Sequence, residues 1–401
     1  MQYRPFGKLG FQVSALGFGA MRLPTVDGVI DEEEATRMIH YAIDQGVNYL
    51  DTAYPYHDGA GEAFVGRALK GGDRERVKLA TKMPSWLVHS ADDFDRYLDE
   101  QMERLQVDYL DFYLLHTLNK DHWPRLRDLG VREWAEKAVA DGRFGRLGFS
   151  FHDDVETFKT IIDEFDWAMC QIQYNYMDVA NQAGLEGLRY AAAKGIAVVI
   201  MEPLRGGKLV DPPSVIQEIW DSATPRRTPV EWALHWLWDQ PEVSVVLSGM
   251  STMEQVKQNI AIAETSRVHS LTDDERALID RVRSAYSGLI AIPCTGCAYC
   301  MPCPQGVDIP GNLANYNEGI MYNNPESSRG HYAWQKFAYE VQQIFTQDVR
   351  AAACVQCGAC ETHCPQAIPI SEWMPVIDRA LGNGGSYPTR LPSRNGQGTG
   401  I

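Results

Sequence analysis

The alternation of short apolar strands with amphipathic helices over the first 290 or so residues constrains the fold more than any other feature of this sequence. The segments 197–200 and 243–247 are almost wholly apolar, as expected for parallel strands that helices cover. Eight β/α units in this length favour a (β/α)8 TIM barrel, an α/β fold, over an open doubly wound sheet. The expected barrel strands are Leu16–Met21, Asn48–Ala53, Val77–Lys82, Tyr109–His116, Arg146–Phe151, Ala168–Tyr174, Ala197–Met201 and Val243–Leu247.

Ionisable side chains stand at the ends of three successive predicted strands. Asp51, Lys82 and His116 end the second, third and fourth strands, and Tyr56 follows in the loop after Asp51. Because active sites of TIM barrels lie at the C-terminal ends of the strands, we expect these side chains to meet. Lys82 paired with Asp51 would place a positive charge near Tyr56 and lower the pKa of the phenol from its reference of about 10. Tyr56 is then the candidate proton donor and acceptor, and His116 would orient a carbonyl oxygen beside it.

Each of these residues also has a purely structural interpretation. An Asp–Lys pair at a barrel rim is more often structural than catalytic, and a histidine at a strand end is usually just hydrogen-bonded. Their occurrence together at consecutive strand ends favours the functional interpretation.

A second region begins near residue 288, where Cys- and Pro-rich turns flank a predicted helical segment at 312–347. Eight of the nine cysteines lie here, in the runs C-x2-C-x2-C-x2-C-P and C-x2-C-x2-C-x3-C-P. Three thiolates at this spacing can bind one cluster, while a fourth that precedes proline is placed to reach another. The sequence therefore predicts two [4Fe-4S] clusters with crossed ligation, one held by Cys294, Cys297, Cys300 and Cys364 and the other by Cys354, Cys357, Cys360 and Cys303.

Two zinc sites are the competing interpretation, since zinc also accepts four thiolates. Zinc fingers pair two C-x2-C hairpins across a long spacer, whereas these groups are continuous runs that end in Cys-Pro. Disulfides are less favoured still, because cysteine clustering in a chain without a secretion signal points to metal ligation. The ninth cysteine, Cys170, lies on a predicted strand and is expected to be a packed thiol.

The chain is acidic, with 37 Lys+Arg against 53 Asp+Glu and a formal net charge of -16. Without a Lys/Arg-rich run, this balance argues against unaided binding to nucleic acid or to an anionic membrane. No segment approaches the roughly 18 consecutive apolar residues of a membrane span, and the first residues lack the layout of a signal peptide. We therefore expect a cytoplasmic protein.

The region from Tyr3 to Ser284 resembles the aldo-keto reductases. The resemblance rests on Asp51-Thr52-Ala53 with Tyr56 and Glu62 beyond it, on Leu79-Ala80-Thr81-Lys82, and on Asp108-Tyr109-Leu110-Asp111 leading to His116. It implies hydride transfer between a nicotinamide cofactor and a carbonyl, with Tyr56 as general acid/base, Lys82 and Asp51 tuning it, and His116 orienting the substrate oxygen. The whole layout resembles the aldo-keto reductases that carry a C-terminal, mainly α-helical, ferredoxin-like 4Fe-4S domain.

The resemblance also implies where a nicotinamide cofactor would bind. Ser150 and Gln171 fall where the family holds the carboxamide, although Phe151 stands where many members have Asn. Met201 stands where many members stack an aromatic ring on the nicotinamide, and a thioether can still pack there. The full set of implied positions is Ser150, Gln171, Met201, Pro203, Leu204, Ser248, Gly249, Gln258 and Asn259.

The choice between NADH and NADPH is set by the loop after the last strand. NADPH-preferring members place Lys, Ser and Arg where this chain has Gly249, Met250 and Gln255. Because a 2′-phosphate normally recruits cations, NADH is at least as strong a candidate as NADPH.

The function that we expect is NAD(P)H-dependent reduction of a small-molecule carbonyl, or oxidation of the matching alcohol. A hydride carries two electrons and each cluster cycles through one, so the clusters either brace their domain or pass electrons to a ferredoxin-like partner. An electron-transfer protein and a nucleotide-binding sensor are the alternatives. Substrate identity depends on the loops near Trp86, at 119–123 and at 211–227, whose shapes composition does not reveal. The expected domains are the barrel at 1–287, the two-cluster ferredoxin-like domain at 288–380 and a Gly/Ser/Pro-rich tail at 381–401.

Overall fold

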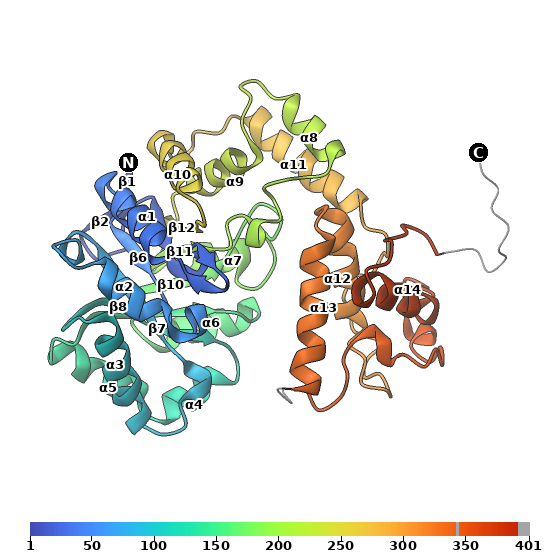
Figure 1. Ribbon diagram of the computed structural model, residues 1–401, viewed down its shortest axis with the longest axis horizontal. Helices are drawn as coiled ribbons and strands as arrows, with labels where there is room; N and C mark the ends of the chain where they lie inside the picture. The colour runs from blue at the N-terminus through green and yellow to red at the C-terminus, as the bar shows by residue number, and fades with distance from the viewer. Residues whose placement is uncertain (342–344, 392–401) are drawn as a thin grey trace. The chain divides into compact units, whose positions relative to one another are not determined.

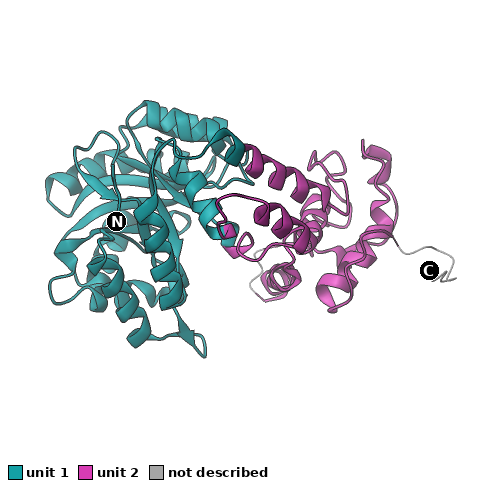
Figure 2. Cartoon of the chain, turned by 90° about the horizontal axis from the view of Figure 1, so that it is seen from above, with its two compact units in different colours: residues 1–206, 230–276 teal, residues 207–229, 277–401 magenta. Residues whose placement is uncertain are grey.

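The computed structural model describes residues 1–341 and 345–391, and the chain divides into two compact units (Figures 1 and 2). Unit 1 comprises residues 1–206 and 230–276, and unit 2 comprises residues 207–229 and 277–401. The end of the expected barrel, residue 287, lies inside helix α11 (Asp273–Gly288). Residues 392–401 of the expected tail and 342–344 of the expected helical segment lie outside the described residues.

Unit 1 contains a closed barrel of eight parallel strands in the order β10-β11-β12-β3-β6-β7-β8-β9. This confirms the predicted TIM barrel. The strands are β3 (Leu16–Gly19), β6 (Tyr49–Asp51), β7 (Lys78–Met83), β8 (Leu110–Leu118), β9 (Phe144–Phe151), β10 (Met169–Gln173), β11 (Ala197–Met201) and β12 (Val243–Gly249).

Helices follow the barrel strands, and their amphipathic patterns explain why they form. In α1 the side chain of Asp31 caps the helix by accepting from the N–H of Glu34, and the apolar residues at helical spacing, Met38 and Ile39 among them, are buried. The helices between residues 32 and 288 are α1 (Glu32–Asp44), α2 (Gly61–Ala68), α3 (Asp92–Leu105), α4 (His122–Asp128), α5 (Val131–Ala140), α6 (Val155–Glu164), α7 (Gly184–Ala193), α8 (Ser214–Asp221), α9 (Pro229–Trp238), α10 (Met253–Thr265) and α11.

Three short pieces of secondary structure lie outside the barrel strands predicted from the sequence. Helix α4 occupies much of the loop after β8, and α8 occupies part of the segment 211–227, which belongs to unit 2. A small hairpin, β4 (Thr25–Val26) with β5 (Val29–Ile30), follows β3. The two helices span only about two turns each and the two strands two residues each, so a repeated apolar period does not reveal them in the sequence.

The core of the barrel unit has two layers. An inner layer fills the barrel and includes Tyr49, Phe112 and Val245, and an outer layer lies between strands and helices. Position 17 requires glycine, because a Cβ there would lie only 2.8 Å from side-chain atoms of Leu247 and Val245. An N-terminal hairpin joins β1 (Tyr3–Pro5) to β2 (Gln12–Ser14), and Phe6, just after β1, and Val13 of β2 belong to the inner layer. The alternation of inward and outward side chains decides which polar residues reach the barrel mouth.

Unit 2 is largely helical, as expected for the region after residue 288. Its helices are α8, the end of α11, α12 (Ile309–Met321), α13 (Pro325–Glu340) and α14 (Ile370–Gly382). The apolar faces of α12, α13 and α14 share one core that includes Leu313, Tyr332 and Ile377. The described part of the tail crosses this unit: Tyr387 stacks on Tyr316 with ring centroids 4.9 Å apart.

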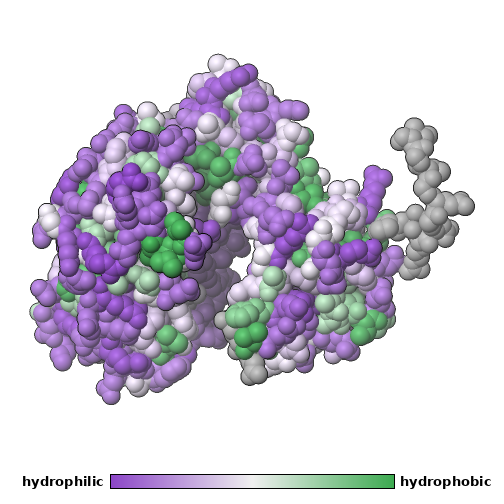
Figure 3. Space-filling model, in the orientation of Figure 1, coloured by the Kyte–Doolittle hydropathy of each residue, from purple (hydrophilic) through white to green (hydrophobic). Residues whose placement is uncertain are grey.

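Hydrophilic residues cover most of the visible surface, and hydrophobic residues form only small separate patches (Figure 3). No helix within the described residues has both the length and the apolar character that crossing a membrane would need.

Candidate functional site

The four predicted catalytic residues meet at the C-terminal ends of neighbouring strands. Lys82 Nζ donates to Asp51 Oδ1 at 2.5 Å, to the Thr52 carbonyl at 2.8 Å and to Tyr56 Oη at 3.2 Å. Tyr56 lies in a short 3-10 turn after β6, and its ring lies edge-on to the His116 imidazole with centroids 6.3 Å apart. A phenol held by a lysine and an imidazole beside it can donate a proton to an oxygen bound between them.

Lys82 and Asp51 are both buried, so their charges depend on each other. Burial alone would lower the pKa of Lys82, but the attraction of Asp51 and the hydrogen bonds to Asp51 and Tyr56 outweigh it and raise the pKa above its usual value. Burial raises the pKa of Asp51, and the contacts with Lys82 and Gln171 oppose that rise. Lys82 therefore keeps its proton at neutral pH.

The net effect on Tyr56 differs from the sequence-based expectation. Lys82 does act to lower the pKa of the phenol, as predicted, but burial is the larger effect and Asp51 adds to it. The pKa of Tyr56 is consequently raised rather than lowered. The position of Lys82 at a strand end indicates a charge near Tyr56, but it does not indicate how deeply Tyr56 is buried. The direction of the pKa shift predicted from the sequence is therefore wrong.

His116 is a neutral imidazole. Burial, followed by the nearby Lys82 and His152, places its pKa well below 6.5. Among the described residues its Nδ1 has no hydrogen-bond partner, and its ring lies 5.3 Å from that of Trp86. A neutral imidazole can offer one N–H to a substrate oxygen without adding charge.

A β-bulge directs His116 into the barrel mouth. In the β8–β9 ladder Leu115 pairs with Phe149 and Leu118 with Phe151, so β8 has one extra residue at this point. Thr117 takes a left-handed conformation there, with φ 56, which is rare for a β-branched residue. Ser150 Oγ accepts from the N–H of Thr117 at 2.8 Å and so holds the bulge in place.

The two residues expected near a nicotinamide carboxamide lie side by side. Ser150 and Gln171 are paired in the β9–β10 ladder and both are buried. Gln171 Nε2 also donates to Asp51 Oδ2 at 3.1 Å, a contact that the sequence did not suggest. Met201 ends β11 beside Gln173, and Pro203 and Leu204 follow it, buried and half-buried.

The positions expected to contact the adenine end of the cofactor differ in burial. Asn259 is buried and its Nδ2 donates to Ser248 Oγ at 3.0 Å, whereas Gln258 is exposed and contacts Glu254 on its own helix. Gly249 is exposed at the end of β12, and a Cβ there would lie 2.7 Å from Cγ of Arg22. Arg22 is thus a cation beside this loop that sequence reasoning missed, because it lies far away along the chain.

A buried polar network supports Lys82 from outside the barrel. Gln101 Nε2 donates to Glu62 Oε1 at 2.5 Å and to the Lys82 carbonyl at 3.0 Å. Thr81 also donates to Glu62, and Tyr113 donates to Gln101. Glu62 in the Asp51–Glu62 motif therefore supports the strand that carries Lys82 without reaching the mouth itself.

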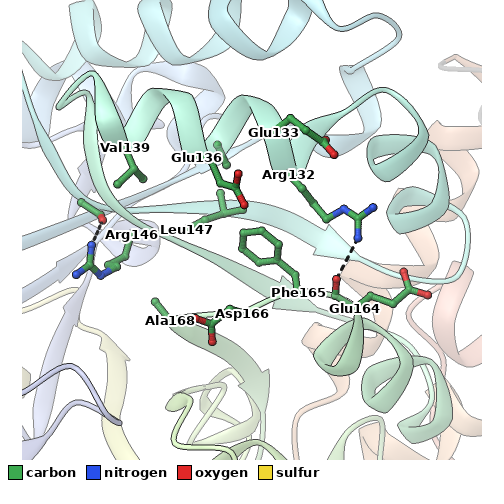
Figure 4. Close-up of a pocket in the computed structure, with 12 residues that line it drawn as sticks. Arg132, Glu133, Glu136, Val139, Arg146, Leu147, Glu164, Phe165, Asp166 and Ala168 are labelled. Carbon is green, nitrogen blue, oxygen red and sulfur yellow. Dashed lines mark hydrogen bonds between the residues drawn. The ribbon is translucent and has the colours of Figure 1, made fainter.

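A hollow of about 720 Å³ lies elsewhere on unit 1 (Figure 4). It is lined by α5, the start of β9 and the turn before β10, and its charged residues have both signs, with Arg132 and Arg146 near Glu136 and Asp166. Strand starts lie at the opposite end of the barrel from the four predicted catalytic residues Asp51, Tyr56, Lys82 and His116 (the tetrad), so this hollow is not part of the candidate site.

The eight clustered cysteines line two adjacent cavities in unit 2. One is lined by Cys294, Cys297, Cys300 and Cys364, and the other by Cys303, Cys354, Cys357 and Cys360 together with the edge residue Cys300. No three Cys, His, Asp or Glu side chains converge on a single ion position within 1–341 and 345–391. Burial, together with the nearby Glu361 and neighbouring thiols, raises the pKa of the Cys360 thiol to about 11. A cation-rich group is needed to hold such thiols as thiolates.

The two cysteine loops share one backbone pattern. In each loop an N–H two residues after the first cysteine donates to its sulfur at 3.4 Å, from Gly296 to Cys294 and from Gln356 to Cys354. Left-handed residues fall at matching places in both loops, and α12 and α14 each begin six residues after the last cysteine. The matching positive-φ residues are Gly296 with Gln356, Ala298 with Gly358, and Gly306 with Ala367. The unit therefore contains an internal repeat of loop and helix.

Cys170 stands apart from this arrangement. It is fully buried in the outer core of the barrel, and burial raises the pKa of its thiol. It is a packed thiol.

The barrel and its tetrad define a class, the oxidoreductases that act on carbonyl and alcohol groups. The Aldo/keto reductase family model matches residues 15–284, and a model described as a 4Fe-4S dicluster domain matches residues 293–368. The chain belongs to the aldo/keto reductase family and carries a C-terminal 4Fe-4S domain.

Known relatives match part of this chain and most of their own length. L-galactose dehydrogenase of Arabidopsis thaliana is 27% identical over 69% of this chain and 92% of its own length. 6-dehydroglucose reductase of Novosphingobium aromaticivorans is 28% identical over 52% of this chain and 71% of its own. Among solved structures, an aldo-keto reductase from Bacillus halodurans in its holo form aligns with TM-score 0.60 and 28% identity over 70% of this chain and 96% of that one. An aldo-keto reductase from Klebsiella pneumoniae in complex with NADPH aligns with TM-score 0.59 and 27% identity over 71% and 96%.

Proposed function

We propose that this protein reduces an aldehyde or ketone with a nicotinamide cofactor, and oxidises the matching alcohol in the reverse direction. The observation that carries the proposal is the contact of Lys82 Nζ with both Asp51 and Tyr56 beside a neutral His116. Tyr56 donates its phenolic proton to the carbonyl oxygen, and His116 orients that oxygen by offering an N–H. The nicotinamide supplies the hydride when bound.

The residues at the mouth fit such a cofactor. Ser150 and Gln171 offer paired polar groups for a carboxamide, and Met201 offers an apolar surface for the ring. Ser248 and Gly249 end the last strand, and Arg22 beside Gly249 provides a cation for a phosphate. NADPH is bound in the Klebsiella pneumoniae relative, and NADH and NADPH both remain candidates here.

We further propose that unit 2 holds two [4Fe-4S] clusters with the crossed cysteine sets predicted above. Four thiols of each set surround one cavity, and N–H groups that point at sulfur, as in both loops, stabilise thiolates. Iron and acid-labile sulfide measured on anaerobically purified protein should give about eight of each per chain for two four-iron clusters.

The activity is tested with Tyr56→Phe. We expect loss of NAD(P)H-dependent aldehyde reduction by about 10²–10⁴-fold, because the general acid is removed. Tyr54→Phe is the matched control, since the Tyr54 hydroxyl contacts Glu100 and not the tetrad. Retained turnover in Tyr56→Phe, or equal losses in both variants, would show that Tyr56 is not the general acid.

A second candidate function is electron transfer to a ferredoxin-like protein. It is favoured by the exposure of Cys297 and Cys357, one in each predicted cluster set, and by exposed Tyr299 and Val355 around the second cavity. Anaerobic EPR after NADH or NADPH, and then after dithionite, separates the two functions. If NADH or NADPH alone produces the signals of reduced clusters, electron transfer is supported. If only dithionite produces them, the result favours a carbonyl reductase whose clusters have a structural role.

A further inference from the structure

His152 stands at the barrel mouth, and the proposed reaction assigns it no contact with the substrate. It directly follows β9, in which Phe149 and Phe151 point outward and pack against Phe158 of α6. Ser150, between them, points inward to the bulge. By the two-residue alternation of a strand, His152 lies on the inward side, one step nearer to solvent than Ser150.

Its neighbours place the His152 ring between two strand ends. The charge that His152 carries when protonated lowers the pKa of His116, which lies near the end of β8. Glu202, just after β11, acts to raise the pKa of His152. The backbone N–H of His152 donates to the Leu118 carbonyl at 3.2 Å, which keeps the residue beside the bulge. The ring is therefore near the place where His116 would hold a substrate oxygen.

The hydrogen bonding of the ring determines what it can recognise. Nδ1 lies 3.2 Å from Gln182 Oε1, an acceptor, so Nδ1 carries the proton. In the neutral ring Nε2 is then an acceptor, and no described residue donates to it. Burial lowers the pKa of His152 and so favours this neutral form.

We propose that Nε2 of His152 accepts a hydrogen bond from a hydroxyl on the carbon next to the reacting carbonyl. The substrates favoured by this site are then 2-hydroxy aldehydes or ketones rather than plain ones. The inference rests on the proposed reductase function and adds a substrate class to it. Phe151 packs outward and cannot supply this acceptor, and the half-buried Trp86 lies beside the His116 ring, with centroids 5.3 Å apart.

The test compares two substrates that differ by one hydroxyl, 2-hydroxypropanal and propanal, in the holo full-length chain and in His152→Leu. We expect the parent to prefer 2-hydroxypropanal in kcat/KM by about tenfold or more, because a site built to bond a hydroxyl rejects the analogue without it. In His152→Leu this preference should disappear, mainly through KM for 2-hydroxypropanal, while propanal turnover stays within about threefold. His152→Gln, which keeps an acceptor, should restore part of the preference.

A cofactor-binding control separates recognition of the substrate hydroxyl from a role of His152 in holding the nicotinamide cofactor. Binding of NADPH and NADH, followed by quenching of tryptophan fluorescence, should be the same in parent and His152→Leu. Weaker cofactor binding with equal losses for both aldehydes would overturn the inference and assign His152 to the cofactor. An unchanged preference in the variant, or no preference in the parent, would overturn it while leaving the reductase function intact. If the parent reduces neither these aldehydes nor any other carbonyl, the proposed function fails and the inference fails with it.

Discussion

The barrel mouth and the cysteine loops are built in opposite ways. At the mouth, Asp51 and Lys82 are buried on adjacent strands and hold each other directly, and Gln101 supports Lys82 from behind. In unit 2 the cysteines lie on loops between left-handed residues, and all eight are half-buried or exposed. The first site is organised by the packing of the protein itself, whereas the second leaves space among its thiols. A site of the second kind depends on its ligand for structure.

The largest effect should come from removing iron. Metal binding contributes on the order of 10 kcal/mol to the folding of small metal-dependent domains, so the unit that depends on it should open when iron is chelated. We expect amides of α12 and α14 to lose protection in hydrogen exchange, while β6, β7 and β8 keep theirs. Equal protection with and without iron would show that the cysteine loops are also organised by packing alone.

A smaller effect is expected when the charge pair of the barrel is broken. Lys82→Met leaves Asp51 buried without its partner, which should cost about 3–5 kcal/mol in the free energy of unfolding. Lys78→Met is the matched control on the same strand: Lys78 is 42% exposed and pairs with Asp111, which also contacts Arg74, so about 1 kcal/mol or less is expected. Urea unfolding of both variants measures the difference. Similar losses in the free energy of unfolding would show that the buried Lys82–Asp51 pair contributes no more to stability than the exposed Lys78–Asp111 pair.

The pH dependence of reduction tests how burial acts on Tyr56. A general acid works below its pKa, and the pKa of Tyr56 is raised, so kcat should stay level through neutral pH and fall only above about pH 10. His116 stays neutral because its pKa is lowered, so no loss is expected near pH 6.5. In Lys82→Met the residual activity should fall at still higher pH, since the attraction that lowers the pKa is gone. A fall near pH 8 in the parent would mean that Lys82 outweighs burial.

The smallest effect is expected in the cysteine loops. Gln356 has φ 57 at the place where the other loop has Gly296, so Gln356→Gly relieves backbone strain and keeps the N–H that donates to Cys354. It also removes the hydrogen bond from Gln356 Nε2 to the Ser371 carbonyl at 3.1 Å, so the two effects oppose each other. The unfolding free energy of the iron-loaded chain should change by less than about 1 kcal/mol. Thermal unfolding measures it, and a large loss would show that the Gln356 side chain has a role that the repeat does not reveal.

The sequence predicted the features that repeat along the chain or occur in short motifs. The barrel strands follow from apolar runs, and the tetrad follows from polar residues at successive strand ends. The raised pKa of Tyr56, the bond from Gln171 to Asp51 and the approach of Arg22 to Gly249 were not predictable, because each depends on residues brought together from distant parts of the chain. The bulge at Thr117 depends on a register that no local pattern specifies.

The way the chain is divided between its units limits how they can be taken apart. The backbone crosses between them at 206/207, 229/230 and 276/277, and Lys208 in the middle segment pairs with Glu318 of α12 at 2.5 Å. Two modules fused end to end would need a single crossing. A chain truncated near residue 288 would therefore not be a complete barrel unit alone. It would keep α8, which belongs to unit 2, but would lack α12, α13 and α14 of that unit. Engineering a free-standing barrel would require replacing residues 207–229 as well, and exchange of the cluster module between proteins would have to carry this segment with it.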